Sequence, residues 1–412
     1  MAKIIVIGGG VVGISCALEL LSDGHKVTVI DRDPAGEDAC WASCGSIAVS
    51  EVIPLSKPGT LMYAPKWLID KSGPLTIRNK SIISILPWFL RFAANSNMSR
   101  IKSISTEISA LTHTAFKDTK NLLAKHNLET LLRKTPVIEV YDSQKELENQ
   151  RIFHDLRREL GFKIEEITGG EAVEIEPSIA KDFACATVFH DWRSIVDTKR
   201  YVLELHKVFT KKGGLVVRDE VVEFTIDGGI AKGVKTKIGD IFSGDQMVVA
   251  AGAWSKKLAK KIGVNIMLEG VIGYQTSLEK PGVDVTHALV YAKGGFGITP
   301  YESGLSIAGS IEFADLSAQP NWKRADILVE KAKRVLPGLQ TKIAKKRIGR
   351  RPLTPDTKPI IGRAPKNKNV IFATGHGQLG LTLAATTALL VARIISNRPL
   401  NIDISAYRPD RF

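Results

Sequence analysis

The sequence has 412 residues, of which 44% are hydrophobic and 24% are charged, and its formal net charge is +14. This length exceeds one ordinary core, so we expect two domains or one large α/β unit, and the composition is typical of a soluble globular protein. A basic surface attracts nucleic acid, anionic lipid or anionic substrates. Because the lysines and arginines are scattered and lack interleaved aromatic residues, we expect no nucleic-acid partner. A solvated surface and peripheral contact with an anionic membrane leaflet both stay open.

Four cysteines, Cys16, Cys40, Cys44 and Cys185, form no C-x-x-C pair. We therefore expect no metal site and no redox dithiol, and a reducing compartment fits best. The first residues lack the basic, apolar and small-residue succession of a signal peptide. The longest apolar run, residues 379–395, is shorter than the roughly 20 residues of a spanning helix and predicts a buried helix. We expect a cytoplasmic protein, with attachment at the cytoplasmic face of the inner membrane as an alternative.

A glycine-rich turn follows the first predicted strand. Residues 3–7, KIIVI, are a β-branched run typical of a buried parallel strand, and Gly8, Gly10 and Gly13 make the pattern G-x-G-x-x-G directly after it. The first glycine permits a tight turn, the second lets the backbone approach a pyrophosphate, and the third lets the next helix pack closely on the strand. The N-terminus of that helix, where Val12 lies, offers free N–H groups to phosphates.

An acidic residue closes the second predicted strand. Gly24 ends the helix, residues 26–30 form a strand, and Asp31 follows at once. The whole succession predicts a dinucleotide-binding fold, in which Asp31 accepts hydrogen bonds from both ribose hydroxyls of an adenosine. This acid would repel a 2′-phosphate, which disfavours NADP. Arg32 is expected beside the same ligand.

The middle of the chain alternates helical and strand-rich portions. Helical spacing covers four ranges, and β-branched or strand-and-turn character covers three others. The helical ranges are 81–128, 143–160, 196–214 and 322–336, and the strand ranges are 186–192, 215–224 and 270–313.

Two later segments repeat the design of a strand followed by small residues. They are DQMVVAAGAWS, residues 245–255, which contains Ala251 and Gly252, and VIFATGHGQLGLTLA, residues 370–384. Small residues at a strand end let a large ligand lie against the backbone. Three such junctions imply one long ligand that lies across a single sheet. FAD is long enough to need them, and its isoalloxazine would lie at the last junction.

The segment RRPLTPDTKPIIG, residues 350–362, carries two arginines among three prolines. Prolines at this density exclude a helix and predict a stiff loop. A planar guanidinium binds a carboxylate through two parallel hydrogen bonds, which fixes its orientation. Considered alone, the arginines are either surface charges or anion ligands.

Together, these motifs resemble the D-amino-acid oxidase superfamily of FAD-dependent oxidoreductases. They are most similar to its D-amino-acid dehydrogenase branch, which includes enzymes acting on D-proline and D-hydroxyproline. The resemblance covers nearly the full length, and its most diagnostic parts are residues 350–362 and 374–384. The other carriers are the glycine turn with Asp31, WASCGSI (41–47) and GITPYESGLSIAGSIEF (297–313). Ser43, Cys44 and Gly45 stand where that branch commonly has Asn-Ala-Gly.

The resemblance implies roles for several side chains. The arginine before the proline binds the substrate carboxylate in this superfamily, which implies that role for Arg351, whereas Arg350 is expected to face solvent or an internal acid. Tyr301 or Tyr274 would hydrogen-bond the same carboxylate. His376 would lie at the flavin, where backbone N–H groups face N1 and C2=O.

The implied cofactor contacts extend along the whole chain, with the backbone near Val222 beside the adenine. They are Gly8, Gly10, Val12, Gly13, Asp31, Arg32, Ser43, Cys44, Gly45, Val222, Ala251, Gly252, Gly375, His376, Gly377, Leu379, Gly380 and Thr382. Noncovalent FAD is expected, because related amine oxidases attach flavin through a cysteine of the C-terminal motif and this chain has none beyond Cys185.

The predicted fold class is α/β, with a Rossmann-like FAD-binding domain and an interleaved α+β substrate domain of antiparallel or mixed sheet plus helices. The FAD-binding domain would comprise residues 1–85, 193–270 and 347–412. The substrate domain would comprise 86–192 and 271–346, with the active site between the two.

The activity implied by the resemblance is oxidation of a D-amino acid or D-imino acid in amino acid catabolism. A hydride would pass from Cα to flavin N5, and the electrons would go to a quinone or another carrier. D-Alanine, D-proline and D-hydroxyproline are substrates of this type. Three alternatives stay open: a glycine or sarcosine oxidase that uses O₂, an RNA-modifying flavoprotein, and a non-catalytic flavin subunit.

Overall fold

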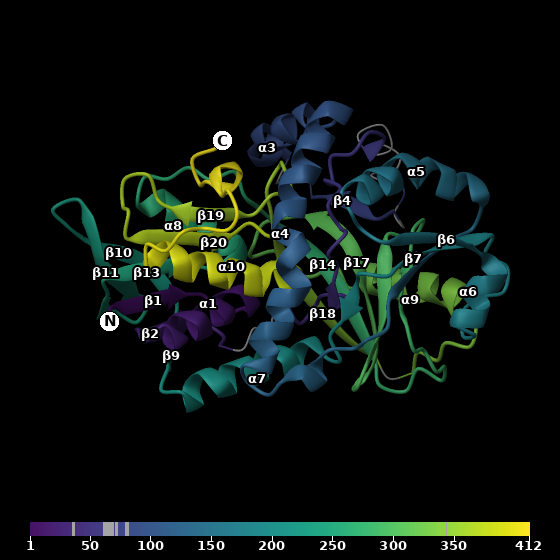
Figure 1. Cartoon of the computed structure of the whole chain (residues 1–412), viewed down its shortest axis with the longest axis horizontal. Helices are drawn as coiled ribbons and strands as arrows, with labels where there is room; N and C mark the ends of the chain where they lie inside the picture. Colours follow the sequence, from purple (N-terminus) through teal and green to yellow (C-terminus); the bar gives the residue numbers. More distant parts are fainter. Residues whose placement is uncertain (35–37, 61–69, 71–72, 79–81, 343) are drawn as a thin grey trace.

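Two large β-sheets form the framework of the computed structural model, which describes residues 1–34, 38–60, 70, 73–78, 82–342 and 344–412 (Figure 1). One sheet has six strands and the other nine within these residues. The long helix α4 (Met98–Ala124) crosses the middle of the molecule, and both chain ends lie on the side of the six-stranded sheet (Figure 1).

The six-stranded sheet has the order β19-β20-β13-β1-β2-β9, and only β19 runs antiparallel to its neighbour. The strands that precede the three predicted glycine junctions, β1, β13 and β20, are adjacent and parallel, so their carboxyl ends meet at one edge. The bounds are β1 (Lys3–Ile7), β2 (Lys26–Asp31), β9 (Leu215–Arg218), β13 (Gln246–Val249), β19 (Ile360–Arg363) and β20 (Val370–Thr374).

Both faces of this sheet are covered, as its continuous apolar strands predict. Ile4 and Val6 of β1 pack into one core with the helices α1, α7 and α10, whereas Ile5 and Ile7 pack into another with α8 and a three-stranded sheet. The predicted apolar run near the C-terminus is the buried helix α10. The bounds are α1 (Val11–Ser22), α7 (Thr198–Lys211), α8 (Ser255–Lys261), α10 (Gly380–Ile395), β10 (Val221–Asp227), β11 (Ile230–Thr236) and β12 (Ile241–Ser243).

The single strand predicted over residues 215–224 is two strands in different sheets. β9 pairs with β2 up to Arg218, after which the Asp219 N–H donates to the carbonyl of Asp31. The chain then turns at Glu220 into β10, which pairs with β11 instead. The β-branched run continues through both strands, so local composition did not reveal the break.

The nine-stranded sheet has the order β18-β14-β17-β16-β15-β5-β7-β6, with β4 paired to the end of β17. Helix α9 covers one face through a core that includes Leu328 and Tyr274. The strand bounds are β4 (Leu75–Ile77), β5 (Val137–Tyr141), β6 (Ile164–Thr168), β7 (Cys185–Phe189), β14 (Glu269–Leu278), β15 (Ala288–Tyr291), β16 (Phe296–Tyr301), β17 (Gly304–Phe313) and β18 (Ala344–Leu353).

The remaining elements connect the two sheets or cap their edges. The helices are α3 (Ile82–Ala94), α5 (Gln144–Glu159), α6 (Gly169–Ile175) and α9 (Lys323–Val335), with single 3₁₀ turns η2 (Glu129–Leu131), η3 (Gly252–Trp254) and η4 (Ser405–Tyr407). The short strands β3 (Ser46–Ile47) and β8 (Arg193–Ser194) pair with each other. Among the described residues, no helix combines the length and apolarity needed to cross a bilayer.

The arginine–proline segment is not a loop at its start. Arg350, Arg351 and Pro352 belong to β18, where Pro352 lies opposite Gly270 of β14. β18 is an edge strand, and an edge strand tolerates a proline because one row of its backbone groups has no partner strand. The loop begins only at Thr354. The domain division stays a prediction, although residues 347–353 and 75–77 pair within the nine-stranded sheet.

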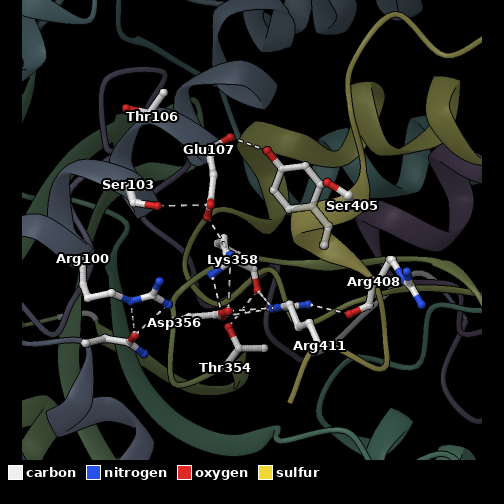
Figure 2. A network of polar contacts seen from close by, with 12 residues as sticks. Arg100, Ser103, Thr106, Glu107, Thr354, Asp356, Lys358, Ser405, Arg408 and Arg411 are labelled. Carbon is white, nitrogen blue, oxygen red and sulfur yellow. Dashed lines mark hydrogen bonds and ion pairs between the residues drawn. The ribbon is translucent and has the colours of Figure 1, made fainter.

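A buried ion network fixes the loop after β18 (Figure 2). Lys358 donates to Glu107 of α4 at 2.6 Å and lies 3.7 Å from Asp356, and Arg411 donates to both Asp356 oxygens at 2.9 and 3.0 Å. The side chains of Lys358, Asp356 and Arg411 are only 8–9% exposed. The network therefore joins α4, the loop and the C-terminal segment.

Asp356→Asn should destabilise the protein by about 3 kcal/mol at pH 7, because it leaves buried cations without their counter-charge. Burial opposes ionisation of Asp356, but the charge and hydrogen bonds of Arg411 together with those of Lys358 outweigh it, so the pKa of this carboxyl lies below its usual value. A depressed pKa contributes stability above the unfolded pKa of about 3.9, and this stability is lost as the pH falls through the folded pKa. Urea unfolding at pH 7 and pH 3 should show the wild-type advantage shrinking at the lower pH. Equal stability of both proteins at pH 7 would contradict this account.

Candidate active site

A cavity of about 790 Å³ is lined by residues of both large sheets. Its volume lies in the range of ligand and cofactor sites. Its lining includes residues at the carboxyl ends of β1, β2, β13 and β20 and side chains of the nine-stranded sheet, among them Arg351 and Ser310.

Gly8, Gly10 and Gly13 of the first glycine-rich turn have different structural roles. Gly8 has φ +104°, and a Cβ there would lie 2.5 Å from the carbonyl oxygen of Ala250. A Cβ on Gly13 would lie 1.9 Å from the carbonyl oxygen of Gly8, so this glycine lets α1 pack on β1 and does not line the cavity. Gly10, the residue before α1, lines the cavity and has no protein atom within 4 Å of such a Cβ. The turn at Gly8 and the close packing at Gly13 match the roles predicted from the sequence, and the approach of Gly10 to a pyrophosphate stays a prediction.

Asp31 is held rigidly at the end of β2. The backbone N–H groups of Gly9 and Asp33 donate to its two carboxylate oxygens, each at 2.6 Å. Burial raises the pKa of Asp31, and these hydrogen bonds partly offset the effect. Arg32 also lines the cavity, and its guanidinium lies 3.6 Å from the ring centroid of Trp254. Each Asp31 oxygen keeps acceptor capacity for a hydroxyl group in the cavity.

Backbone from the other two junctions completes this side. Val12, Val222, Ala251 and Gly252 line the cavity, as do His376, Gly377, Leu379 and Gly380. Gly375 and Thr382 do not. Gly375 makes the turn with φ +74°, and the Thr382 hydroxyl accepts a hydrogen bond from the Ala48 N–H at 3.0 Å.

The His376 ring is part of the protein interior. Its Nε2 lies 2.9 Å from the hydroxyl of Thr387, and the residue is 3% exposed. Burial lowers the pKa of His376 to about 3, so the ring is neutral near pH 7. The structure therefore gives this histidine a buried, neutral ring next to Thr387 rather than a charged side chain.

The loop with Ser43, Cys44 and Gly45 lines the cavity opposite the C-terminal junction. Two side chains of β16 hold it: Thr299 donates to the carbonyl of Cys44 at 2.6 Å, and Tyr301 donates to the carbonyl of Ser43 at 3.1 Å. The Cys44 thiol donates to the carbonyl of Ala308 at 3.3 Å. Tyr301 thus supports the loop from behind and is not among the residues that line the cavity.

Tyr274 lies on the opposite face of the nine-stranded sheet, away from the cavity. Its hydroxyl donates to Glu312 and accepts from the Asn321 N–H. Burial, followed by the Glu312 interaction, raises the pKa of Tyr274 to about 12. Side chains alternate between the two faces of a strand, so its neighbour Gly273 faces the cavity side instead. The structure does not bring Tyr274 to the site.

Arg351 is the prominent cation of the cavity. Its guanidinium lies over Gly273, where a Cβ would be 2.5 Å from Cζ, and Nη1 donates to the carbonyl of Ser310 at 2.9 Å. Burial lowers the pKa of Arg351. Among the described residues, no carboxylate forms an ion pair with it, whereas Arg350 pairs with Asp38 at 3.3 Å as an internal acid. A guanidinium that faces a cavity without a counter-charge is a ready binding site for a carboxylate.

Gly273→Ala should leave the fold intact but lower kcat/KM for a carboxylate substrate by about 10–100-fold, because the new methyl group displaces the guanidinium. The clash is with a flexible side-chain end, so the melting temperature should change little. Steady-state kinetics and a thermal melt of the same preparation check this. Unchanged kcat/KM would show that the position of the Arg351 guanidinium over Gly273 is not needed for activity.

Several residues that line the cavity are not among the predicted site residues. Glu139 is the clearest, because it interrupts the apolar strand VIEVY and a charged residue inside such a strand could have been noticed. Glu51 and Trp192 are two others, whereas Trp254, Ser310 and Gln378 line the cavity from within the segments 245–255, 297–313 and 370–384. Among the described residues, no group of three or more His, Cys, Asp or Glu side chains is placed to hold a metal ion.

The residues present fit FAD. Gly10 leaves open space at the start of α1, Asp31 presents acceptors beyond it, and the cavity continues past β13 to the turn at Gly377. An adenosine, a pyrophosphate and a ring system joined in one ligand need that succession of surfaces. The fold and the cavity together define a dinucleotide-binding flavoprotein.

Comparisons with known proteins agree. Residues 3–394 match the model of the family described as FAD dependent oxidoreductase, DAO. The chain is 30% identical to the D-amino-acid oxidase of Bradyrhizobium diazoefficiens over 99% of this chain and 98% of that one. It is 28% identical to the D-amino acid dehydrogenase of Vibrio atlanticus over 98% and 99%. The chain belongs to the DAO family of FAD-dependent oxidoreductases; it is an enzyme, and FAD is its cofactor.

Solved structures share the fold. Glycine oxidase from Geobacillus kaustophilus superposes with a TM-score of 0.74 at 19% identity and covers 100% of both chains. L-proline dehydrogenase from P. horikoshii gives 0.74 at 19% identity over 100% of this chain and 97% of that one. The predicted family resemblance and the predicted fold class are both confirmed.

Proposed function

We propose that the protein is an FAD-dependent dehydrogenase of D-amino acids or D-imino acids of the D-alanine, D-proline or D-hydroxyproline type. The observation that carries the proposal is the half-buried Arg351 guanidinium, which faces the cavity without a carboxylate partner among the described residues. Relatives named D-amino-acid oxidase and D-amino acid dehydrogenase support the D configuration. Noncovalent attachment of FAD stays part of the proposal.

Arg351 would bind the substrate carboxylate through two parallel hydrogen bonds, with its Nη1 also fixed by the Ser310 carbonyl. The flavin, when bound, accepts the hydride of the substrate Cα. The chain's contribution is alignment, which can be worth several kcal/mol of the barrier. The N-terminus of α10 and the backbone of Gly377 lie along the cavity, where they favour negative charge.

The proposed electron acceptor is a quinone or another carrier rather than O₂. The net charge of +14 is suited to peripheral contact with an anionic membrane leaflet, where a quinone would be found. A glycine or sarcosine oxidase is the second candidate, because glycine oxidase from Geobacillus kaustophilus shares the fold.

The test is anaerobic mixing of the holoenzyme with D- and L-amino acids, prolines, glycine and sarcosine, followed by the flavin absorbance. We expect bleaching by D-amino or D-imino acids, faster reoxidation by a quinone analogue than by O₂, and no bleaching by L-isomers. Bleaching by glycine or sarcosine with stoichiometric peroxide in air would favour the oxidase instead. Absence of bleaching by every compound would reject both.

A further inference from the structure

A second buried arginine lies behind the carboxylate site. Arg324, in the first turn of α9, is 5% exposed and lies outside the lining of the cavity. Its Nε donates to the Ser310 hydroxyl at 2.8 Å, its Nη2 to the carbonyl of Gly73 at 2.8 Å, and its Nη1 to the Thr76 hydroxyl. All three acceptors are neutral. The acid in its surroundings, Glu312, already pairs with Arg78 at 2.9 Å.

Among the described residues, Arg324 has no ion-pair partner. Burying a cation in this way is costly, and hydrogen bonds to neutral groups return only part of that cost. An ion pair between exposed side chains could connect α9 to the segment at Gly73 equally well. The position of Arg324 therefore needs a reason other than stability, and its Ser310 partner supplies one.

Ser310 is held in an unusual backbone conformation. It has φ +65°, which is uncommon for a residue with a side chain, and it lies in a β-bulge where Gly273 of β14 faces both Ser310 and Ile311 of β17. Bulges of this kind re-aim groups beside active sites. Here the bulge directs the Ser310 carbonyl at Arg351 Nη1, 2.9 Å away. The Ser310 hydroxyl is held by Arg324.

We propose that Arg324 is a positioning residue for the substrate carboxylate, which acts through Ser310 to aim the guanidinium of Arg351. One serine thus accepts a hydrogen bond from each of two arginines, the buried Arg324 at its hydroxyl and the half-buried Arg351 at its carbonyl. The inference rests on the proposed function, because it concerns how the same carboxylate site is organised. Arg324 itself touches neither substrate nor cofactor.

The experiment measures binding of benzoate, a carboxylate without an amine, to the oxidised holoenzyme through the change in flavin absorbance. Arg324→Met should raise the benzoate Kd and the substrate KM by about tenfold or more, with a much smaller change in kcat at saturation. Arg324→Lys, which keeps the charge and one donor, should restore part of the binding. FAD content and the melting temperature are recorded for each variant.

Arg334→Met is the matched control. Arg334 lies on the same helix, but it pairs with the half-buried Asp142 at 3.0 Å and the exposed Asp182 at 2.8 Å and does not line the cavity. Its removal should leave the benzoate Kd unchanged. A purely structural role for Arg324 would lower the melting temperature of Arg324→Met without raising the Kd.

Ser310→Ala tests the route of the effect and replaces Arg324→Met if that variant does not fold. Ser310→Ala should raise the benzoate Kd. The double variant Arg324→Met/Ser310→Ala should have a Kd no higher than that of the weaker-binding single variant, because both changes remove the same hydrogen bond between Arg324 and Ser310. An unchanged Kd in Ser310→Ala, or simple additivity, would overturn the proposal. If Arg351→Met binds benzoate like the wild type, the proposed function falls. If Arg351→Met weakens benzoate binding but the Arg324 and Ser310 variants do not, the proposed function stands and only the positioning role of Arg324 is rejected.

Discussion

Arg351→Met should stay yellow but lose reduction by amino acids. Removing one partner of a buried, hydrogen-bonded charge pair costs about 2–5 kcal/mol, which corresponds to a loss of roughly 30- to 5,000-fold in kcat/KM. FAD should be retained, because the residues that fit its adenosine and pyrophosphate, such as Gly10 and Asp31, belong to the six-stranded sheet and its helix α1, whereas Arg351 belongs to the nine-stranded sheet. Anaerobic stopped-flow reduction and the flavin content of the purified variant give both quantities.

The control for this variant is Arg347→Met, on the same edge strand. Arg347 donates to Gln275 and Ser277 and does not line the cavity, so its loss should leave reduction unchanged. Arg351→Lys should fall between the two, because a lysine cannot form the planar, two-bond contact with a carboxylate. Normal reduction of Arg351→Met would remove the guanidinium from the reaction.

Gly13→Ala and Gly10→Ala should both weaken FAD binding, but for different reasons. In Gly13→Ala the methyl group would lie 1.9 Å from the Gly8 carbonyl oxygen, so α1 must move away from β1. Overpacking of this kind costs about 1–3 kcal/mol or more, and the apoprotein should melt at a lower temperature. Gly10→Ala meets no protein atom within 4 Å, so the apoprotein should keep its stability. Its added methyl group would nevertheless occupy cavity space that a pyrophosphate needs.

The measurements are the melting temperature of the apoproteins and the FAD Kd by fluorescence titration. A Gly13→Ala apoprotein as stable as the wild type would contradict the packing role of that glycine. A Gly10→Ala variant that binds FAD with wild-type affinity would place the pyrophosphate somewhere else.

The dinucleotide half of the site could be predicted because its signals are local. Gly8, Gly10 and Gly13 follow a strand and begin a helix within one turn, and Asp31 closes the next strand, so neighbouring residues decide the geometry. The adjacency of β1, β13 and β20 followed from the repetition of one design at three places. In each case the backbone, rather than a distant side chain, determines the position.

The substrate half depends on which face of the second sheet is turned toward the cavity. The sequence pattern of a strand shows that successive side chains point to opposite faces, but it does not show which face is turned toward the ligand. A one-residue bulge also reverses the alternation for the residues that follow it. For this reason the sequence alone predicts Tyr274 at the site, although its neighbour Gly273 is the residue beneath Arg351. The prolines after Arg351 indicated a loop, because the sequence does not show that β18 is an edge strand.

Long-range partners were beyond local reasoning altogether. Arg324 is separated from the Gly73 carbonyl by about 250 residues of chain, and nothing near either residue indicates the contact. Glu139 and Trp192 reach the cavity from strands and turns far from the motifs. Such contacts are set by how the two sheets pack, which the sequence pattern of a single element does not encode.

The most direct test is a crystal structure of the oxidised holoenzyme with a bound carboxylate such as benzoate. We predict the carboxylate at Arg351, with both oxygens about 2.7–2.9 Å from guanidinium nitrogens, and Ser310 still bonded to Nη1. A carboxylate bound elsewhere in the cavity, with Arg351 turned away from it, would contradict the account.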